Sequence, residues 1–144
     1  MKTKLILAAA LSTVFFCGTA AARDSVLTLP LADIVGTDKA KQALLEVPFY
    51  FAGQNHPKVT NNWGDISTNK KTNAVGKSDS EACQWVLLSA IKALQEAAQK
   101  RGYDAVVNIR SNYKNNEFSS ATEYNCGAGR IMAGVALKGE LVKF

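Results

Sequence analysis

The pattern of apolar and polar residues predicts one long amphipathic helix in the second half of the chain. Over residues 83–98, apolar side chains recur at the three- and four-residue spacing of a helix. Ser78 and Glu81 form a capping pattern before this run, and Gly102 follows it. We therefore predict a helix over Asp79–Arg101. Its solvent-facing side is expected to carry Gln95, Glu96, Gln99 and Lys100.

Shorter apolar segments, bounded by Pro, Gly or polar turns, predict strands on both sides of this helix. A short helix is expected over residues 38–45, and residues 68–79 read as a polar connection. The predicted order gives an α+β domain, in which one mainly antiparallel sheet packs against one long helix. The strands are expected at residues 25–29, 47–52, 59–68, 103–111, 117–124 and 130–138.

The first residues have the pattern of a secretory signal peptide. Lys2 and Lys4 precede an apolar run, and three alanines that end at Ala22 provide a small-residue cleavage site. We predict a signal peptide over residues 1–22 and a single domain over residues 23–144. The domain is then periplasmic or secreted.

Two alternatives for the N-terminus and the membrane are not favoured. Lipid attachment at Cys17 would need small residues before it, whereas Phe15 and Phe16 stand there. After the predicted signal peptide, no segment reaches the roughly 20 apolar residues of a membrane-spanning helix. We therefore expect no transmembrane segment.

The net charge of the chain limits the classes of partner that we expect. The 144 residues include 17 Lys and Arg against 12 Asp and Glu. Because Lys2 and Lys4 lie in the predicted signal peptide, the excess in the exported domain is mild. A nucleic-acid-binding domain would have denser basic clusters, so nucleic acid is not an expected partner. The excess fits contact with anionic surfaces of the cell envelope.

Cys83 and Cys126 are the two cysteines that follow the predicted signal peptide. An even pair in an oxidising compartment predicts a disulfide. Two free thiols and two metal ligands are the alternatives. The pair is too widely spaced for the C-x-x-C pattern of redox or zinc sites, so we predict no metal and no cofactor.

The stretch "YNCGAGRIMAG" around Cys126 suggests a phosphate-binding loop at first sight. The dinucleotide fingerprint needs a third glycine where Met132 stands, and it must open a helix. Here a strand is predicted instead. We interpret Gly127 and Gly129 as a sharp bend beside a bridged cysteine, with Arg130 left as a residue to test for binding.

Three segments resemble a family of small secreted bacterial proteins that are often labelled "excinuclease ATPase subunit". They are "TNKKTNAVGKSDSEAC", "DAVVNIRSNYKNNE" and "SSATEYNCGAG". The label conflicts with the residues, because the chain lacks the G-x-x-x-x-G-K-[ST] pattern of ATP-binding loops. The resemblance assigns no established function.

The helix end and the strand "DAVV" that follows it also resemble two further groups. These are the C-terminal domain of the outer-membrane Rcs stress-sensor lipoprotein and the YbjQ-type domains. In the lipoprotein, cysteines tie the helix region to the following strands. This resemblance implies a role in envelope stress sensing or envelope maintenance.

Candidate catalytic residues are few. His56 is the only histidine, and Glu117 and Glu123 are the nominal acid–base pair. An enzyme that acts on an envelope polymer, or a metal-binding protein, therefore remains the alternative. Our main prediction is a non-catalytic binding protein.

Basic residues with an aromatic among them predict a binding face. Its unidentified partner would be an anionic envelope polymer or another envelope protein, and an ordinary solvated surface is the alternative. Trp63 and Trp85 are expected to pack in the core rather than stack on a ligand. The predicted face comprises Lys70, Lys71, Lys77, Arg110, Tyr113, Lys114 and Arg130.

Overall fold

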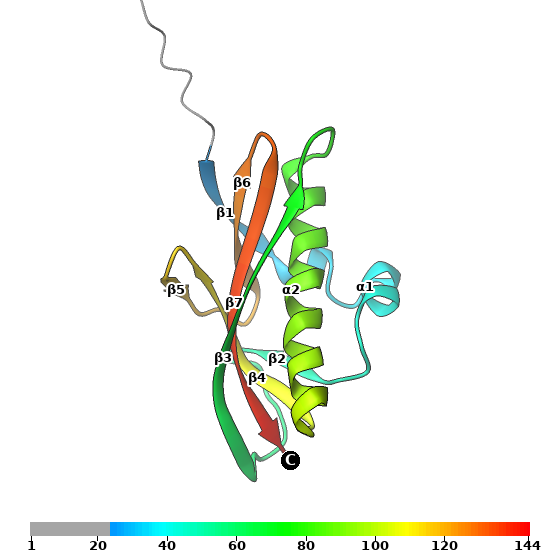
Figure 1. The fold of residues 1–144 in the computed structure, drawn as a ribbon, viewed down its shortest axis with the longest axis vertical. Helices are drawn as coiled ribbons and strands as arrows, with labels where there is room; N and C mark the ends of the chain where they lie inside the picture. The colour runs from blue at the N-terminus through cyan, green and yellow to red at the C-terminus, as the bar shows by residue number, and fades with distance from the viewer. Residues whose placement is uncertain (1–23) are drawn as a thin grey trace, which may run out of the picture.

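The computed structural model describes residues 24–144, and the predicted signal peptide over residues 1–22 lies outside them. A curled seven-stranded sheet packs against one long helix, α2 (Figure 1). The predicted α+β class is confirmed. The elements are β1 (Asp24–Pro30), the 3₁₀ turn η1 (Leu31–Asp33), α1 (Asp38–Ala43), β2 (Phe49–Phe51), β3 (Asn61–Asn73), α2 (Asp79–Arg101), β4 (Ala105–Tyr113), β5 (Asn116–Phe118), β6 (Glu123–Gly129) and β7 (Met132–Lys143).

Helix α2 begins and ends where the sequence predicts. The Ser78 hydroxyl accepts a hydrogen bond from the Glu81 amide at 3.1 Å, which satisfies one of the free N–H groups of the first turn. At the other end, Gly102 adopts φ +71°, the left-handed conformation that closes helices. Both local signals therefore act as expected.

Strand β7 is the centre of the sheet. It pairs with β3 along its whole length, antiparallel, from Met132 to Lys143. Its other edge is shared, because β6 pairs with its first residues and β4 with its last. Strand β1 extends the sheet beyond β6 and β2 extends it beyond β4, the latter as the one parallel pair. This division lets the sheet curl around the helix.

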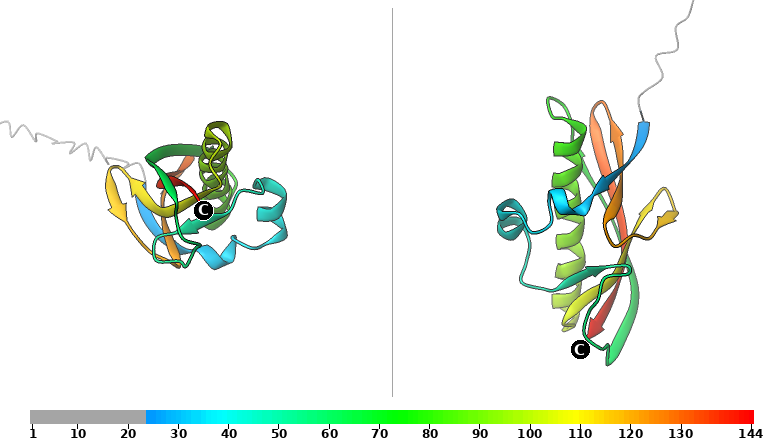
Figure 2. Two further views of the ribbon diagram at one scale, coloured as in Figure 1. Left: turned by 90° about the horizontal axis from the view of Figure 1, so that it is seen from below. Right: turned by 180° about the vertical axis from the view of Figure 1, so that it is seen from behind.

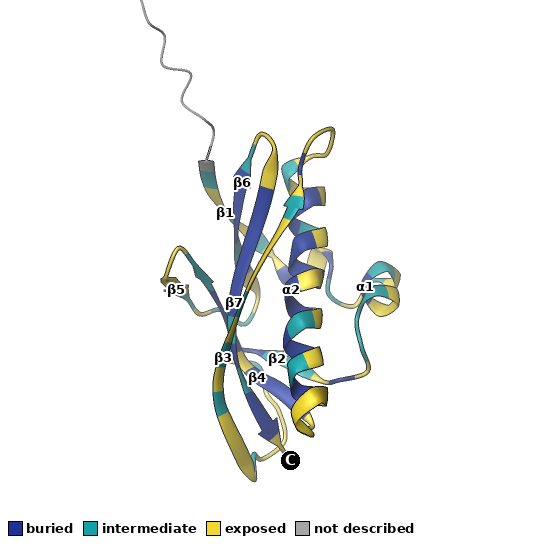
Figure 3. Ribbon diagram, viewed as in Figure 1, coloured by how far each residue is buried: buried dark blue, intermediate teal, exposed yellow. Residues whose placement is uncertain are grey.

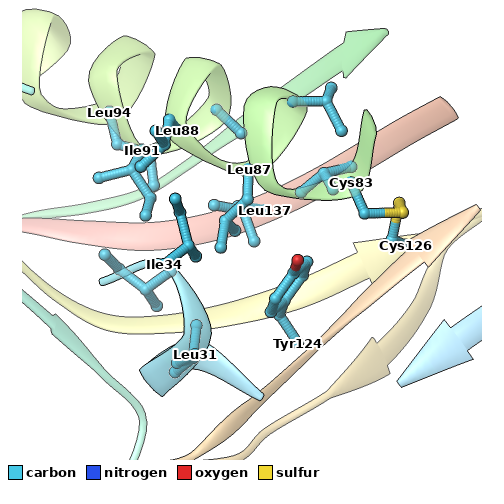
Figure 4. Close-up of a cluster of buried hydrophobic side chains, with 14 of the residues drawn as sticks. Leu31, Ile34, Cys83, Leu87, Leu88, Ile91, Leu94, Tyr124, Cys126 and Leu137 are labelled. Atoms are coloured by element: carbon cyan, nitrogen blue, oxygen red, sulfur yellow. A yellow bond between two sulfur atoms is a disulfide. The ribbon is translucent and has the colours of Figure 1, made fainter. Parts of the chain in front are cut away.

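Side chains alternate between the two faces of the sheet. In β7, Val135, Leu137 and Leu141 point toward α2 and belong to the main core, which the buried face of α2 completes (Figures 3 and 4). The intervening residues of β7 face away from the helix. On that far face a smaller apolar cluster forms around Ala105, Val107 and Val142.

The predicted disulfide is confirmed. Cys83 in the second turn of α2 is bonded to Cys126 in β6, with a Cα–Cα distance of 5.9 Å (Figure 4). This separation is typical of disulfides. The bond fixes the N-terminal part of the helix to the sheet.

Two boundary predictions are wrong. Residues 68–73 continue β3, although they were expected to form a connection, and β7 runs to Lys143 instead of stopping at Lys138. Strand β3 is long, polar and at the edge of the sheet, so its sequence has no apolar alternation to reveal it.

The predicted return strand over residues 117–124 is two separate strands. Lys114 and Asn115 both have positive φ, +52° and +62°, and form the tight turn of the β4–β5 hairpin. Strand β5 ends at Phe118 and β6 begins at Glu123, beside β1. The hairpin therefore projects from the sheet, and the chain re-enters it on β6.

Gln95 corrects the expected solvent side of α2. It is fully buried, and its amide oxygen accepts from the Leu45 amide at 3.0 Å. Its amide nitrogen donates to the carbonyls of Leu45 and Val47, at 2.9 and 2.8 Å. Gln95 thus holds the connection that leads from α1 past the helix to β2, visible in Figure 2. A polar residue with three backbone partners can be buried at little cost.

Candidate functional site

The predicted basic residues Lys70 and Lys71 point to opposite faces of β3. Lys70 is in register with Val135, which faces the helix, whereas Lys71 is in register with Gly134 on the far face. Lys71 Cγ lies 3.7 Å from the place where a Cβ at Gly134 would stand, and Tyr113 Cε2 lies 3.6 Å from it. The structure therefore brings Lys71 and Tyr113 together over Gly134.

Tyr113 also explains the glycine beside Cys126. Gly127 is inside β6, opposite Gly134 in β7, so the predicted sharp bend is wrong. A Cβ at Gly127 would overlap the ring of Tyr113. The glycine is needed here for close approach of an aromatic ring to the sheet, and the backbone stays extended.

Arg110 belongs to a network of ion pairs on the far face, apart from the other predicted basic residues. Its side chain, 10% exposed, donates to Asp65 at 3.1 and 2.7 Å and lies 3.6 Å from Glu117. Lys138 Nζ donates to the same Glu117 carboxylate at 3.0 Å. Two carboxylates therefore neutralise Arg110 and Lys138.

These contacts lower the pKa of both carboxyl groups of the network. The hydrogen bond from Arg110 lowers the pKa of Asp65, and the hydrogen bond from Lys138 lowers the pKa of Glu117. Both carboxyl groups are therefore held as carboxylates. This is the environment of a structural network, because an acid catalyst needs a raised pKa.

The other nominal catalytic residues are not brought together with Glu117. His56 lies against Tyr50 and Phe144, with ring centroids 5.6 and 6.3 Å away. Glu123 begins β6, opposite Pro30 in β1. Within residues 24–144, no hydrogen bond or ion pair links the three candidates.

Basic and apolar side chains gather at the end of the molecule where α2 begins. The loop of residues 74–78 and the β6–β7 turn at residues 130–131 meet there, and the Ala74 amide donates to the Ile131 carbonyl at 2.7 Å (Figure 1). We call these two segments, together with Met132, the tip. Lys77 and Arg130 lie in it, and Lys77 Nζ donates to the Asn73 carbonyl at 3.1 Å.

Lys70 and Lys71 lie in β3 just before the tip. Together with Lys77 and Arg130 they place four exposed cations at this end of the molecule, with Lys70 and Lys71 on opposite faces of the sheet. None of the four has an ion-pair partner among the described residues. Lys114 lies in the β4–β5 turn, with its Nζ 5.6 Å from the centre of the Tyr113 ring. The predicted face is therefore divided between the tip, the Tyr113 region and the Arg110 network.

Three apolar residues of the tip were not predicted as functional. Ile131, Val75 and Met132 are 66%, 62% and 46% exposed. Ile131 and Met132 fall at the start of the predicted strand of residues 130–138, where apolar residues are ordinarily assigned to the core, so their exposure could not be read from the pattern. For Val75 the available signal was its position beside Gly76 in the predicted polar connection of residues 68–79, because connections expose their side chains.

The prediction that both tryptophans are in the core is wrong. Trp63 is 55% exposed and packs edge-on against Tyr103, with Arg101 5.3 Å from its ring centre. Trp85 is 41% exposed, and Lys39 Nζ lies 3.9 Å from its ring centre. In both cases a cation from a neighbouring segment covers part of the ring, which makes partial exposure favourable.

A shallow, open pocket of about 420 Å³ lies along the segment that joins α1 to β2. It is lined by one continuous run of residues, from Leu45 to Tyr50, with Glu46 as its only ionisable carboxylate. Glu46 has no basic group opposite it in this lining. The pocket therefore has a few polar atoms but no convergent catalytic set.

Known proteins give no further guide to this site. No protein-family model, curated protein or solved structure matches the chain. The resemblances drawn from the sequence blocks therefore stay predictions.

Residues 24–144 contain no group of three or more His, Cys, Asp or Glu side chains arranged to hold a metal ion. Within the same residues, no helix is long and apolar enough to cross a membrane. At the tip, exposed cations and exposed apolar side chains lie close together, and no aromatic ring in the described part of the chain covers these cations.

Proposed function

We propose that this protein is a non-catalytic binding protein of the cell envelope, and that its tip and the adjacent β3 lysines bind an anionic envelope component. The observation that supports this most directly is the group of four cations without ion-pair partners among the described residues, namely Lys70, Lys71, Lys77 and Arg130. Arg110 and Lys138 are instead neutralised by Asp65 and Glu117.

Surface cations without ion-pair partners favour the binding of an anionic ligand. An unpaired cation on the surface keeps its full attraction for an incoming anion, and several at one end of a small domain add their fields. Such binding weakens as salt increases, since exposed charges are screened beyond about 8 Å at physiological ionic strength. We infer a role in envelope maintenance or stress sensing, as the sequence resemblance implies.

The experiment is a titration with deacylated lipopolysaccharide, a soluble envelope polymer that keeps its phosphate groups and has lost its acyl chains. The wild-type protein should bind with an affinity that falls steeply between 50 and 300 mM salt, because the Debye length shortens from about 14 Å to about 6 Å over this range. The double variant Lys71→Gln/Arg130→Gln should bind about tenfold or more weakly, because removal of two attractive charges weakens binding without altering packing.

The matched control is Lys58→Gln/Lys92→Gln, which removes the same charge from exposed positions outside the tip. It should bind nearly as well as the wild type. Equal weakening in both double variants would show that only net charge matters, and the proposed site would be wrong. Absence of salt-dependent binding in the wild type would reject the proposed function.

A further inference from the structure

The tip carries apolar side chains that a soluble domain does not need to expose. Ile131, Val75 and Met132 are neighbours on two adjoining segments, joined by the Ala74–Ile131 hydrogen bond and by the pairing of Met132 with Asn73. They point outward although the core lies directly below them, at Ala74 and Ala133. Clustered exposure of this kind marks a contact surface more often than isolated exposed side chains do.

Cations surround this apolar group. Arg130 precedes Ile131 in the turn, Lys77 follows Val75 in the loop, and Lys71 lies on β3 below Met132. Two acidic residues, Asp79 and Glu81, also lie at this end, in the first turn of α2. They face the positive end of the helix dipole, which offsets part of their charge. An apolar centre with a cationic rim matches the boundary between acyl chains and anionic headgroups.

The chain also enters the fold at this end. Asp24, the first residue of β1, pairs with Gly129 beside the β6–β7 turn. The predicted signal peptide, with its apolar run at residues 5–16, therefore leads directly into β1, whose first residue is paired beside the tip. Before cleavage such a segment holds the polypeptide at a membrane, so the tip would be the part of the domain nearest to that membrane.

We propose that the tip binds an anionic lipid bilayer, with Ile131, Val75 and Met132 inserted among the headgroups and the cations against the lipid phosphates. This inference rests on the proposed function and names the occupant of the same site. The orientation follows from the fold, because Trp63 and the C-terminus lie at the opposite end, near the end of α2 (Figure 1). A protein partner, or a second copy of the chain, is the competing occupant.

The experiment is cosedimentation of the full chain with vesicles, expressed with its N-terminal segment so that the cell carries out any processing. Intact mass fixes the N-terminus, which all variants share. Vesicles of 30% phosphatidylglycerol in phosphatidylcholine are compared with pure phosphatidylcholine. The wild type should bind the anionic vesicles more tightly, because each Lys or Arg near an anionic surface strengthens binding about fivefold.

Three variants identify the surface. Val75→Asn/Ile131→Asn should weaken vesicle binding about tenfold, since it removes two inserted apolar side chains. Ile131→Trp keeps an apolar side chain and should bind at least as tightly as the wild type, which separates loss of contact from loss of folding. Trp63→Gln removes an equally exposed apolar residue from the opposite end, and it should bind like the wild type.

The outcomes separate this inference from the proposed function. Vesicle binding that is unchanged in Val75→Asn/Ile131→Asn, or lost in Trp63→Gln, would overturn the membrane contact. Binding of deacylated lipopolysaccharide without binding of anionic vesicles would overturn it too, and would leave the proposed function standing. A tip variant that shifts the sedimentation coefficient of the free protein would identify a contact between copies, against the proposal.

Discussion

Replacement of Gly127 by alanine tests how the far face of the sheet is built. Gly127 in β6 and Gly134 in β7 are directly opposed, and the ring of Tyr113 lies over both. At Gly127 a Cβ would occupy the space of the Tyr113 ring, whose Cζ and hydroxyl are the nearest atoms. At Gly134 the nearest atoms to a Cβ are 3.6 Å away, which is ordinary van der Waals contact.

The stability change expected for Gly127→Ala depends on which atoms must move to make room for the new Cβ. In Gly127→Ala the backbone cannot yield, since β6 is paired on both sides, so the Tyr113 ring must leave its place. Overpacking of this kind lowers the free energy of unfolding by about 1–3 kcal/mol. We expect about 2 kcal/mol and not the upper end of this range, because the half-buried Tyr113 ring can move toward solvent. Gly134→Ala should change stability by less than about 0.5 kcal/mol.

The assay is urea unfolding, followed by tryptophan fluorescence, of a double-mutant cycle with Tyr113→Ala. In the Tyr113→Ala background the clash is absent, so Gly127→Ala should cost less than about 0.5 kcal/mol, and the coupling energy should be well above error. If Gly127→Ala costs the same in both backgrounds, the ring is not the reason for the glycine. Equal costs for Gly127→Ala and Gly134→Ala would refute the geometry as well.

Three further predictions concern the core. Reduction of the Cys83–Cys126 bond, which closes a loop with a separation of 43 residues, should lower the free energy of unfolding by about 4 kcal/mol; an unchanged urea midpoint in reductant would contradict this. Gln95→Leu should cost about 3 kcal/mol because three backbone partners lose their hydrogen bonds, whereas Gln99→Leu on the exposed side should cost little. Burial raises the pKa of Tyr124 to about 12. The unfolded chain therefore loses this proton first, near pH 10, so stability is complete below pH 10 and falls by about 1.4 kcal/mol per pH unit up to about pH 12. Tyr124→Phe should remove this alkaline slope in urea titrations across that range, and a slope that persists would assign it to another group.

The helix was predictable because its signals are local. The capping residue Ser78, the apolar period and Gly102 all lie within one segment, and each acts through neighbouring backbone groups. The long edge strand β3 has no such signal, since only its pairing with β7 makes residues 68–73 extended. Pairing between distant segments depends on the whole sheet, so it escaped a reading of the sequence alone.

The burial of polar residues could not be predicted from the local sequence pattern either. Gln95 falls at a helical position that a sequence assigns to solvent, yet the α1–β2 connection covers it. Arg110 carries a charge that predicts binding, yet Asp65 and Glu117 come to it from β3 and β5. The Gln95 partners and Asp65 are supplied by segments that lie 45 to 50 residues away in the sequence. Charge alone therefore predicted the residue types of the candidate site, and the fold decided which of them remain available.

The same structural features explain why the tip keeps its apolar side chains outside. The disulfide at Cys126 and the Tyr113 ring over Gly127 both hold β6 just before the turn, and the Ala74–Ile131 hydrogen bond ties the turn to the loop before α2. These contacts hold the backbone of the turn in an arrangement that leaves Ile131 exposed. Because the backbone of the turn is held in place before binding, less conformational entropy is lost when a ligand binds. The stretch around Cys126 and Gly127 thus stabilises the backbone next to the candidate site, although none of its glycines contacts a ligand in the proposed mode.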